Sequence, residues 1–412
     1  MHPSRRLYAA GAVALATMPL AMALANRSSP LFVTVAALLF LAGRLLEDAG
    51  SVPRLLVPPL AAPLGLAALA FLAWCGLAMA WSPFPALSLR MAGEFLPTLV
   101  AAALLARLAP GRIPNFAAAL AAASVVLAGL VIAVGLAAGL PLQRALGQRV
   151  AEFVYNRPAL TLAVVAGPLA LALWRQDRRI LALAVPTFAA LGILRSVSGA
   201  AAMGLGAGLA MFVLARLLPA RIAVSLAGLG LGLAVALAPV EGDLLDRFMP
   251  EAAHERLVHS SSRARVAIAR SFGAAVAADP WFGAGFGTAA RFAEAPVAER
   301  LDPEMRTLLA VGHPHNAFLQ VWAELGVVGA VLATAVLMLM LAPLATWPGA
   351  DRATALALVA AAASIALVEH NTWAAWWTAG LGAAITWLRE AAGRTARPSL
   401  SRPGAGPDRT TP

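Results

Sequence analysis

The stretch VGHPHNAFLQVWAELGVVGAVLATAVLMLMLAPL, residues 311–344, decides the fold class. Its apolar run is long enough to cross a bilayer as a helix, which takes about 20 residues. Two histidines and an asparagine stand just before the apolar run, and Glu324 lies inside it. The stretch therefore predicts a membrane-spanning helix that carries polar groups in its first turns.

Apolar runs of this kind recur along the whole chain of 412 residues. Hydrophobic residues make up 61% of the sequence and charged residues only 12%, which is more apolar surface than one soluble core would bury. In lipid, a helix satisfies its own backbone hydrogen bonds, whereas an open strand does not. We therefore predict an all-α, polytopic membrane protein, and this composition excludes a soluble domain.

Prolines and glycines divide the apolar sequence into twelve segments. We expect about 12 transmembrane helices, near residues 7–25, 30–46, 57–80, 89–108, 114–139, 158–174, 179–195, 198–217, 221–240, 315–342, 353–370 and 374–390. The chain then divides into a nine-helix membrane region at 1–240, a large, partly helical loop at 241–314, a three-helix membrane region at 315–390 and a disordered tail at 391–412. The first segment ends like a cleavable signal peptide, but a second span follows at once, so we expect it to be retained.

The basic residues, all of them arginines, predict the orientation of the chain. They are more frequent at every second joint, which places both termini in the cytoplasm and the large loop on the far side. In a bacterium this arrangement means the inner membrane, with a periplasmic loop. The formal charge of +11 is then explained by helix ends that meet membrane lipids, and we expect no nucleic acid partner.

The large loop contains a predicted helix, which runs from a serine N-cap near Ser261 to a stop at Pro280. At about 100° per residue, Phe272 and its apolar neighbours share one face, and Arg265 falls on that same face. An arginine on an apolar face either reaches the lipid headgroups or binds a buried anion. Arg263 falls nearly opposite, which is typical of a solvated face.

The motif WFGAGFG, residues 281–287, follows this helix directly. Glycines at alternate positions allow tight turns and a close approach of two backbones. As a phosphate loop the motif is weak, because no strand precedes it and no lysine follows it. We therefore predict a turn that returns the chain to the membrane.

A polar stripe begins the span at 315–342. Asn316, Gln320 and Glu324 are spaced by four residues, so they lie on one face of the predicted helix. A carboxylate is costly in lipid, so Glu324 should face a polar cavity or a partner within the bundle. We expect the stripe to form one wall of a polar pocket that opens outward.

The histidines raise the possibility of a metal site. His313 and His315 are two residues apart, and His254 and His259 lie in the same loop. No HExxH motif and no clustered acidic residues complete a zinc ligand set, so we expect no metal. The single cysteine, Cys75, lies in an apolar run; it allows no intrachain disulfide and suggests no metal either.

A neutral imidazole is also well suited to accept a proton from a hydroxyl group near neutral pH. An arginine on the other side of a substrate would hold a phosphate group through its planar guanidinium. His315 and Arg265 would supply these two groups at the lipid–water boundary. Such a pair suits transfer from a lipid-linked phosphate donor and needs no cofactor.

These residues resemble the signature of the O-antigen ligase/polymerase superfamily. The resemblance lies in His315-Asn316 followed by Glu324-Leu325, Gly326 and Gly329, with Arg265 and the 280–287 segment ahead of the histidine. The expected layout of twelve spans, with one large outer loop before the tenth, is also similar to that of the superfamily. The motifs cover only about residues 265–330, and the other spans are similar in layout alone.

The resemblance implies a GT-C-like, metal-independent glycosyltransferase that moves a glycan from undecaprenyl pyrophosphate at the periplasmic face. The acceptor would be lipid A–core in an O-antigen ligase, which we expect first. In an O-antigen or exopolysaccharide polymerase of the same superfamily, the acceptor would be another growing, lipid-linked glycan.

The resemblance also implies roles for individual residues. His315 would activate the acceptor hydroxyl, and Arg265 would bind the pyrophosphate and stabilise the charge of the leaving group. Arg157, at the outer start of the sixth span, would be a second cation that binds the pyrophosphate. The alternative role for Arg157 is that of an arginine that positions a helix end at the membrane surface. The candidate substrate contacts are Arg157, Arg263, Asn316 and Glu324. Whether Arg195 or the Glu369-His370 pair lines the same site stays open.

Two other classes of protein compete with the enzyme. Twelve spans and an intramembrane Glu324 would suit a secondary transporter or a lipid-glycan flippase, but no second copy of the HPHN pattern marks an inverted repeat. A scaffold for a glycan-assembly complex is the third hypothesis, and it predicts that His315→Ala and Arg265→Ala are both tolerated.

Overall fold

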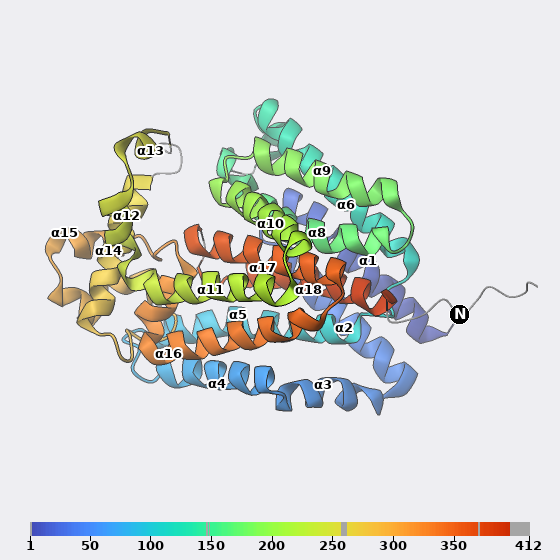
Figure 1. Cartoon of the computed structure of the whole chain (residues 1–412), viewed down its shortest axis with the longest axis horizontal. Helices are drawn as coiled ribbons and strands as arrows, with labels where there is room; N and C mark the ends of the chain where they lie inside the picture. Colours follow the sequence, from blue (N-terminus) through green and yellow to red (C-terminus); the bar gives the residue numbers. More distant parts are fainter. Residues whose placement is uncertain (1, 146, 148, 257–261, 370, 396–412) are drawn as a thin grey trace, which may run out of the picture.

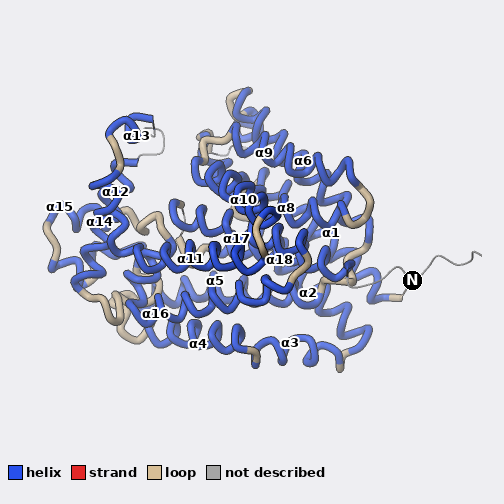
Figure 2. The backbone as a smooth tube through the Cα atoms, in the orientation of Figure 1, coloured by secondary structure: helices blue, strands red, loops and turns tan. Residues whose placement is uncertain are grey.

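The computed structural model describes residues 2–145, 147, 149–256, 262–369 and 371–395. Every regular element in these ranges is a helix, and they contain no strand (Figure 2). This confirms the predicted all-α class.

Each of the twelve apolar segments coincides with a long helix or, at 57–80, with two helices that meet at a bend of 77°. The bent pair is α3 (Ser51–Ala61) and α4 (Pro63–Ala78). The other long helices are α1 (Pro3–Leu24), α2 (Ser29–Asp48), α5 (Pro85–Leu108), α6 (Asn115–Ala137), α8 (Asn156–Trp174), α9 (Arg179–Arg195), α10 (Gly199–Leu217), α11 (Ala220–Leu237), α16 (Ala317–Leu341), α17 (Gly349–Val368) and α18 (Ala375–Thr395).

The number of membrane spans is smaller than expected. Of the helices described, nine are long and apolar enough to cross a membrane, or ten if the bent α3–α4 pair is one span. α9 is not among them and has only 17 residues. α18 is not among them either, and arginine and glutamate side chains make its last turns polar. The structure therefore confirms a polytopic membrane protein but not the count of twelve.

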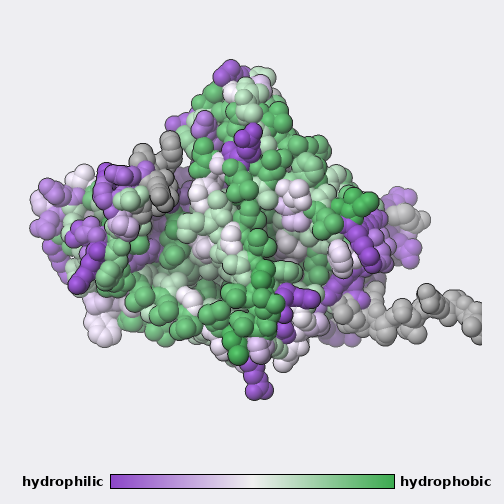
Figure 3. Space-filling model, turned by 45° about the horizontal axis from the view of Figure 1, so that its top comes forward, coloured by the Kyte–Doolittle hydropathy of each residue, from purple (hydrophilic) through white to green (hydrophobic). Residues whose placement is uncertain are grey.

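The long helices run roughly side by side along the long axis of the molecule (Figure 1). Apolar residues cover much of the middle of the surface, while hydrophilic residues gather toward its two ends (Figure 3). This is the distribution that a membrane requires, because only the ends of the helices then meet water and lipid headgroups.

The segment 241–314 forms a lobe at one end of the bundle, at the left of Figure 1. Its helices are α12 (Glu241–Phe248), α13 (Glu251–Arg256), α14 (Ser262–Ala278) and α15 (Pro303–Leu309), joined by the short turns η4 (Ala289–Glu294) and η5 (Pro296–Arg300). α14 is the helix predicted in the loop, and it ends before Pro280 as expected. Its predicted N-cap, Ser261, lies outside the described residues. The lobe confirms a large loop that is partly helical.

Short helical turns complete the chain between the long helices. They are α7 (Pro141–Ala145), η1 (Glu152–Tyr155), η2 (Ala238–Val240) and η6 (Ala342–Thr346). α18 continues to Thr395, past the expected start of the tail at residue 391, and residues 396–412 lie outside the described part of the chain.

The segment between α1 and α2 meets the segments before α8 and α18 at the end of the bundle that bears the lobe, which we call the lobe end. There the Asn26 side chain donates to the carbonyl oxygen of Val154 at 3.1 Å, and Ser29 donates to that of Trp376 at 2.8 Å. At the opposite end, which we call the far end, Arg175 donates to the carbonyl oxygen of Ala391 at 2.6 Å. Which side of the membrane each end faces stays a prediction.

Candidate active site

A break in α16 positions the site. Gly326 has φ +64° and ψ −165°, inside a segment that is otherwise helical. A Cβ atom at this position would lie 2.2 Å from the carbonyl oxygen of Trp281, so only glycine fits. The break separates the first turns of α16, which carry the polar stripe, from its long apolar part.

The glycine-rich segment 281–287 fills the break. Its three glycines all have positive φ, at +67°, +99° and +74°, as the alternate spacing predicts for tight turns. The backbone N–H of Gly285 donates to the carbonyl oxygen of Glu324 at 2.9 Å, and the N–H of Val327 donates to that of Pro280 at 2.8 Å. The segment therefore satisfies backbone groups that the broken helix leaves open.

The carboxylate of Glu324 is the centre of this arrangement, and it is fully buried. It accepts hydrogen bonds from the backbone N–H groups of Gly287 at 2.6 Å and Ala289 at 3.1 Å. It also accepts from Nε2 of Gln320 at 2.9 Å and from the indole Nε1 of Trp373 at 2.7 Å. Of the two surroundings expected for Glu324, the structure shows a set of partners within the bundle.

Asn316 begins α16 as its N-cap. Its Oδ1 accepts from the backbone N–H groups of Phe318 at 2.8 Å and Leu319 at 3.1 Å, and its Nδ2 donates to the carboxylate of Glu241 in α12. Such a cap satisfies helix donors that have no partner within the helix.

The polar stripe holds separate segments together. Gln320 accepts from the backbone N–H of Thr372 at 2.9 Å, so the stripe fixes α12, residues 371–373 and the glycine-rich segment to α16. Asn316, Gln320 and Glu324 are 2%, 0% and 0% exposed. The three side chains therefore do not form the expected wall of a pocket that opens outward, because protein groups take up their polar atoms. Direct contacts of Asn316 and Glu324 with a substrate stay predictions.

His315 lies immediately before this fixed cap. Its φ of +56° is a left-handed conformation, which costs a non-glycine residue about 1–2 kcal/mol. Its backbone N–H donates to Nδ1 of His313 at 3.2 Å, and the two ring centroids are 4.2 Å apart. The Nδ1 atom of His315 is buried and has no hydrogen-bond partner in the part of the chain that the structure describes.

Arg265 reaches from α14 toward the loop between α17 and α18. Its guanidinium donates to Oε2 of Glu369 at 3.0 Å and to the carbonyl oxygen of Val368. The side chain is 32% exposed, at the edge of the buried face that Phe272 occupies. The helical-wheel prediction for the apolar face is thus confirmed, and Arg265 pairs with a carboxylate at its edge.

Arg265 and His315 are close enough to interact electrostatically. Burial lowers the pKa of the His315 imidazole to about 4, and the neighbouring His313 and Arg265 add to this shift. Burial and the charge of Arg265 also lower the pKa of His313. Near neutral pH, His315 is therefore unprotonated, which is the form that accepts a proton.

Arg157 approaches the same region from the start of α8. Its guanidinium carbon lies 5.4 Å from the ring centroid of Trp376, a cation–π contact. Arg157 also interacts electrostatically with Arg27 and Glu369. Glu369 thus pairs with Arg265 and interacts electrostatically with Arg157, the two arginines for which the resemblance implies a pyrophosphate role, and whether Glu369 lines a substrate site stays a prediction.

Arg263 and Arg195, two further candidates from the sequence, have different surroundings, as has Arg270 on the same helix as Arg263. Arg263 forms an exposed ion pair with Glu251 of α13, and Arg270 donates to Asp243 at 3.0 Å and Asp246 at 2.9 Å. These contacts agree with the solvated face predicted for Arg263, and its contact with a substrate stays a prediction. Arg195 is exposed at the end of α9.

The metal alternative involves residues that are only partly described. Among the described residues, no three side chains of His, Cys, Asp or Glu are placed to share a metal ion. His259, His370 and the side chain of His254 lie outside that part.

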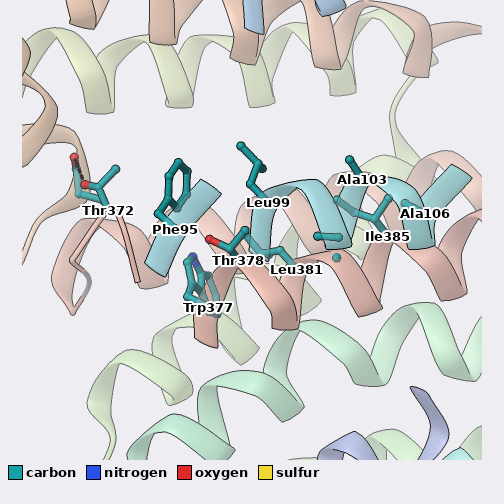
Figure 4. A pocket seen from close by; sticks show the side chains of 12 residues that line it. Phe95, Leu99, Ala103, Ala106, Thr372, Trp377, Thr378, Leu381 and Ile385 are labelled. Carbon is teal, nitrogen blue, oxygen red and sulfur yellow. Dashed lines mark hydrogen bonds between the residues drawn. The ribbon is translucent and has the colours of Figure 1, made fainter. Parts of the chain in front are cut away.

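An apolar groove with a volume of about 450 Å³ begins beside the site, and the sequence did not predict it (Figure 4). Ala317 and Thr372 line one end of the groove, next to the start of α16. From there it follows α5 and α18, where Phe95, Leu99 and Leu381 are among the lining residues. The only hint in the sequence is the polar and aromatic stretch EHNTWAAWW, residues 369–377, which places Thr372 and Trp377 at the outer end of the last span.

Residues 180–334 match the family model of O-antigen ligase. The matched part extends from α9 into α16 and contains Arg265, the glycine-rich segment, His315 and Glu324. It supports the O-antigen ligase/polymerase superfamily, as the resemblance predicts, and suggests a glycosyltransferase-like enzyme. No curated protein matches the chain.

Proposed function

We propose that this protein is a glycosyltransferase that moves a glycan from undecaprenyl pyrophosphate to an acceptor hydroxyl at the periplasmic face, with lipid A–core as the acceptor. One observation carries the proposal: the buried Nδ1 of His315 has no hydrogen-bond partner among the described residues, and the guanidinium of Arg265 is close enough to interact electrostatically with this ring. This pair supplies a proton acceptor and an anion-binding group at the same end of a membrane bundle.

The proposed reaction is a displacement at the anomeric carbon of the glycan. The acceptor oxygen attacks this carbon, and its proton passes to the imidazole of His315. The bond between the anomeric carbon and the pyrophosphate oxygen breaks, and its electron pair leaves with undecaprenyl pyrophosphate. Arg265, and Arg157, which also interacts electrostatically with Glu369, stabilise the negative charge that develops on this leaving group.

The surroundings of the pair support these roles. Contacts with Val368 and Glu369 orient the guanidinium of Arg265, while the capped start of α16 fixes the backbone that carries His315. Glu369 is therefore a positioning residue in this proposal. The apolar groove along α5 and α18 begins beside His315, and we assign it to the isoprenoid chain of the donor.

The experiment is complementation of a bacterial strain that lacks the gene, with gel analysis of its lipopolysaccharide. His315→Ala and Arg265→Ala should each abolish complementation at normal protein levels. Arg90→Ala is the matched control, because Arg90 is an exposed arginine at the lobe end of α5 whose ion-pair partner among the described residues is Glu94 in the same helix. Full complementation by both site variants would contradict the proposal and favour a scaffold. Partial complementation by His315→Ala would favour a transporter or flippase, because transport would survive this substitution in part.

The gel pattern also tells the acceptors apart. Free lipid A–core with intact polymer on its carrier identifies a ligase, whereas core that bears a single repeat identifies an O-antigen polymerase. Normal lipopolysaccharide together with loss of exopolysaccharide would indicate that the acceptor is a growing exopolysaccharide and not lipid A–core.

A further inference from the structure

The far end of the bundle contains an arginine without a counterion. Arg389 lies in the last turns of α18, and its Nε is buried without a hydrogen-bond partner in the described ranges. Within those same ranges no carboxylate forms an ion pair with it, and Arg107 is close enough to repel its charge. A partly buried charge without an ion-pair partner is unfavourable, so this position favours the binding of an anion.

Arg389 lines a cavity with a volume of about 880 Å³ at the far end. Arg175 and Arg394 line it as well, and Glu390 is the only acidic side chain among its lining residues. The cavity thus carries an excess of positive charge, whereas the groove along α5 and α18 is lined mainly by apolar residues.

The acidic groups near the cavity already have partners. Asp351 pairs with Arg175 at 2.8 Å, while Glu390 pairs with Arg394 at 2.9 Å. Glu390 also accepts from the backbone N–H of Gly111 at 2.6 Å. Arg389 is therefore the cation of the cavity whose charge a ligand would balance.

The location of the cavity indicates the kind of anion. The apolar groove between α5 and α18 includes Ala106, which adjoins Arg107, and Ile385, which lies one helical turn before Arg389. Trp347, an aromatic residue of the type that lies at membrane interfaces, lines the cavity. A cationic cavity that adjoins apolar helix surface at the end of a membrane bundle matches a lipid, with a charged headgroup and apolar chains.

We propose that this cavity binds the phosphodiester headgroup of an anionic phospholipid, with Arg389 as the principal contact. The site is separate from the proposed active site, since α5 and α18 begin near one and end near the other. The inference therefore does not depend on the proposed function, and a failure of either leaves the other intact.

The test is lipid binding to the purified, delipidated full-length chain, counted by native mass spectrometry during titration with phosphatidylglycerol or phosphatidylcholine. Phosphatidylglycerol should bind more tightly, and Arg389→Gln should weaken its binding roughly five- to tenfold, as one arginine near an anionic headgroup contributes. Arg389→Lys should retain most of the binding. Arg221→Gln is the matched control, because Arg221 is an exposed arginine at the far end, in the first turn of α11, and it should change nothing.

Three outcomes would overturn the proposal. The first is equal affinity of the wild-type chain for phosphatidylglycerol and phosphatidylcholine, a comparison that needs no variant to fold. The second is an equal effect of Arg389→Gln and Arg221→Gln. The third is thermal stabilisation by sodium phosphate that equals stabilisation by phosphatidylglycerol, which would identify a site for free phosphate and not for a lipid.

Discussion

Glu324 and Trp373 lie 49 residues apart in the chain, and the indole Nε1 of Trp373 donates a hydrogen bond to the carboxylate of Glu324 at 2.7 Å. The same carboxylate accepts from Gly287 and Ala289, so one buried side chain joins the lobe, α16 and the loop before α18. Two of these segments carry His315 and Arg265. Glu324 therefore helps to hold the two residues in place without contacting either of them.

Glu324→Gln should destabilise the fold although it preserves the shape of the side chain. The amide presents N–H groups where a carboxylate oxygen now accepts from donors, so at least one buried donor loses its acceptor, at a cost of about 1–3 kcal/mol. The measurement is the melting temperature in detergent. Glu294→Gln is the control, because Glu294 is an exposed residue of the lobe and should shift melting little. Equal melting of the two variants would show that the hydrogen bonds to Glu324 contribute nothing.

Gly326→Ala should be among the most destabilising single substitutions in α16. Its Cβ would lie 2.2 Å from the carbonyl oxygen of Trp281, and its φ is positive, so steric overlap and backbone strain add. Gly230→Ala in α11 is the control, since a Cβ there meets nothing within 4 Å and alanine favours a helix by about 1 kcal/mol. Thermal melting should fall for the first variant and stay unchanged or rise for the second. A Gly326→Ala protein that melts like wild type would contradict the packing of the glycine-rich segment.

Arg265→Lys should lower kcat/KM roughly 10- to 100-fold with its positive charge intact. A lysine lacks the planar guanidinium that bonds to Val368 and Glu369 and that would also hold two pyrophosphate oxygens. Transfer of a labelled glycan in proteoliposomes provides the rates. Arg270→Lys on the same helix is the control, because Arg270 pairs with Asp243 and Asp246 on the exposed side. Similar losses in both variants would point to a general weakening of the lobe.

The pH dependence of transfer should show a displaced acid limb. Protonation of His315 removes the proton acceptor, and its pKa of about 4 predicts that kcat/KM falls only at about pH 4–5 and below. A bound pyrophosphate brings negative charge beside the imidazole and raises its pKa. The acid limb of kcat, which reports the enzyme–substrate complex, should therefore lie at a higher pH than that of kcat/KM.

The control for the pH profile is His315→Ala, whose residual activity should lack this acid limb. A kcat/KM profile that falls around pH 6.5, the ordinary pKa of histidine, would contradict the burial of His315 as a determinant of its protonation.

The sequence predicts the local features of this protein well. The helical class, the helix at 262–278 and its apolar face follow from composition, capping and periodicity, all of which depend on neighbouring residues. The place of Arg265 on the apolar face of its helix indicates a functional role from the sequence alone. The count of spans is less secure, because α9 is short and the last turns of α18 are polar.

The partners of the polar residues could not be predicted, because they come from distant segments. The need of Glu324 for a partner follows from its place in an apolar run, but three of its four donors lie 35 to 49 residues away along the chain. Arg265 meets Glu369 across 104 residues. Local sequence patterns carry no signal for such distant pairs, and the expected open pocket is closed by contacts of this kind.

The interruption at Gly326 also bears on how the lobe is coupled to the membrane helices. The first turns of α16 are fastened to the lobe and to residues 371–373, while the longer part of the helix packs among its membrane neighbours. The segment around the glycine-rich turn bonds to both sides of the break, to Glu324 before it and to Val327 after it. A substrate that displaces the lobe would therefore also act on the membrane-embedded part of α16.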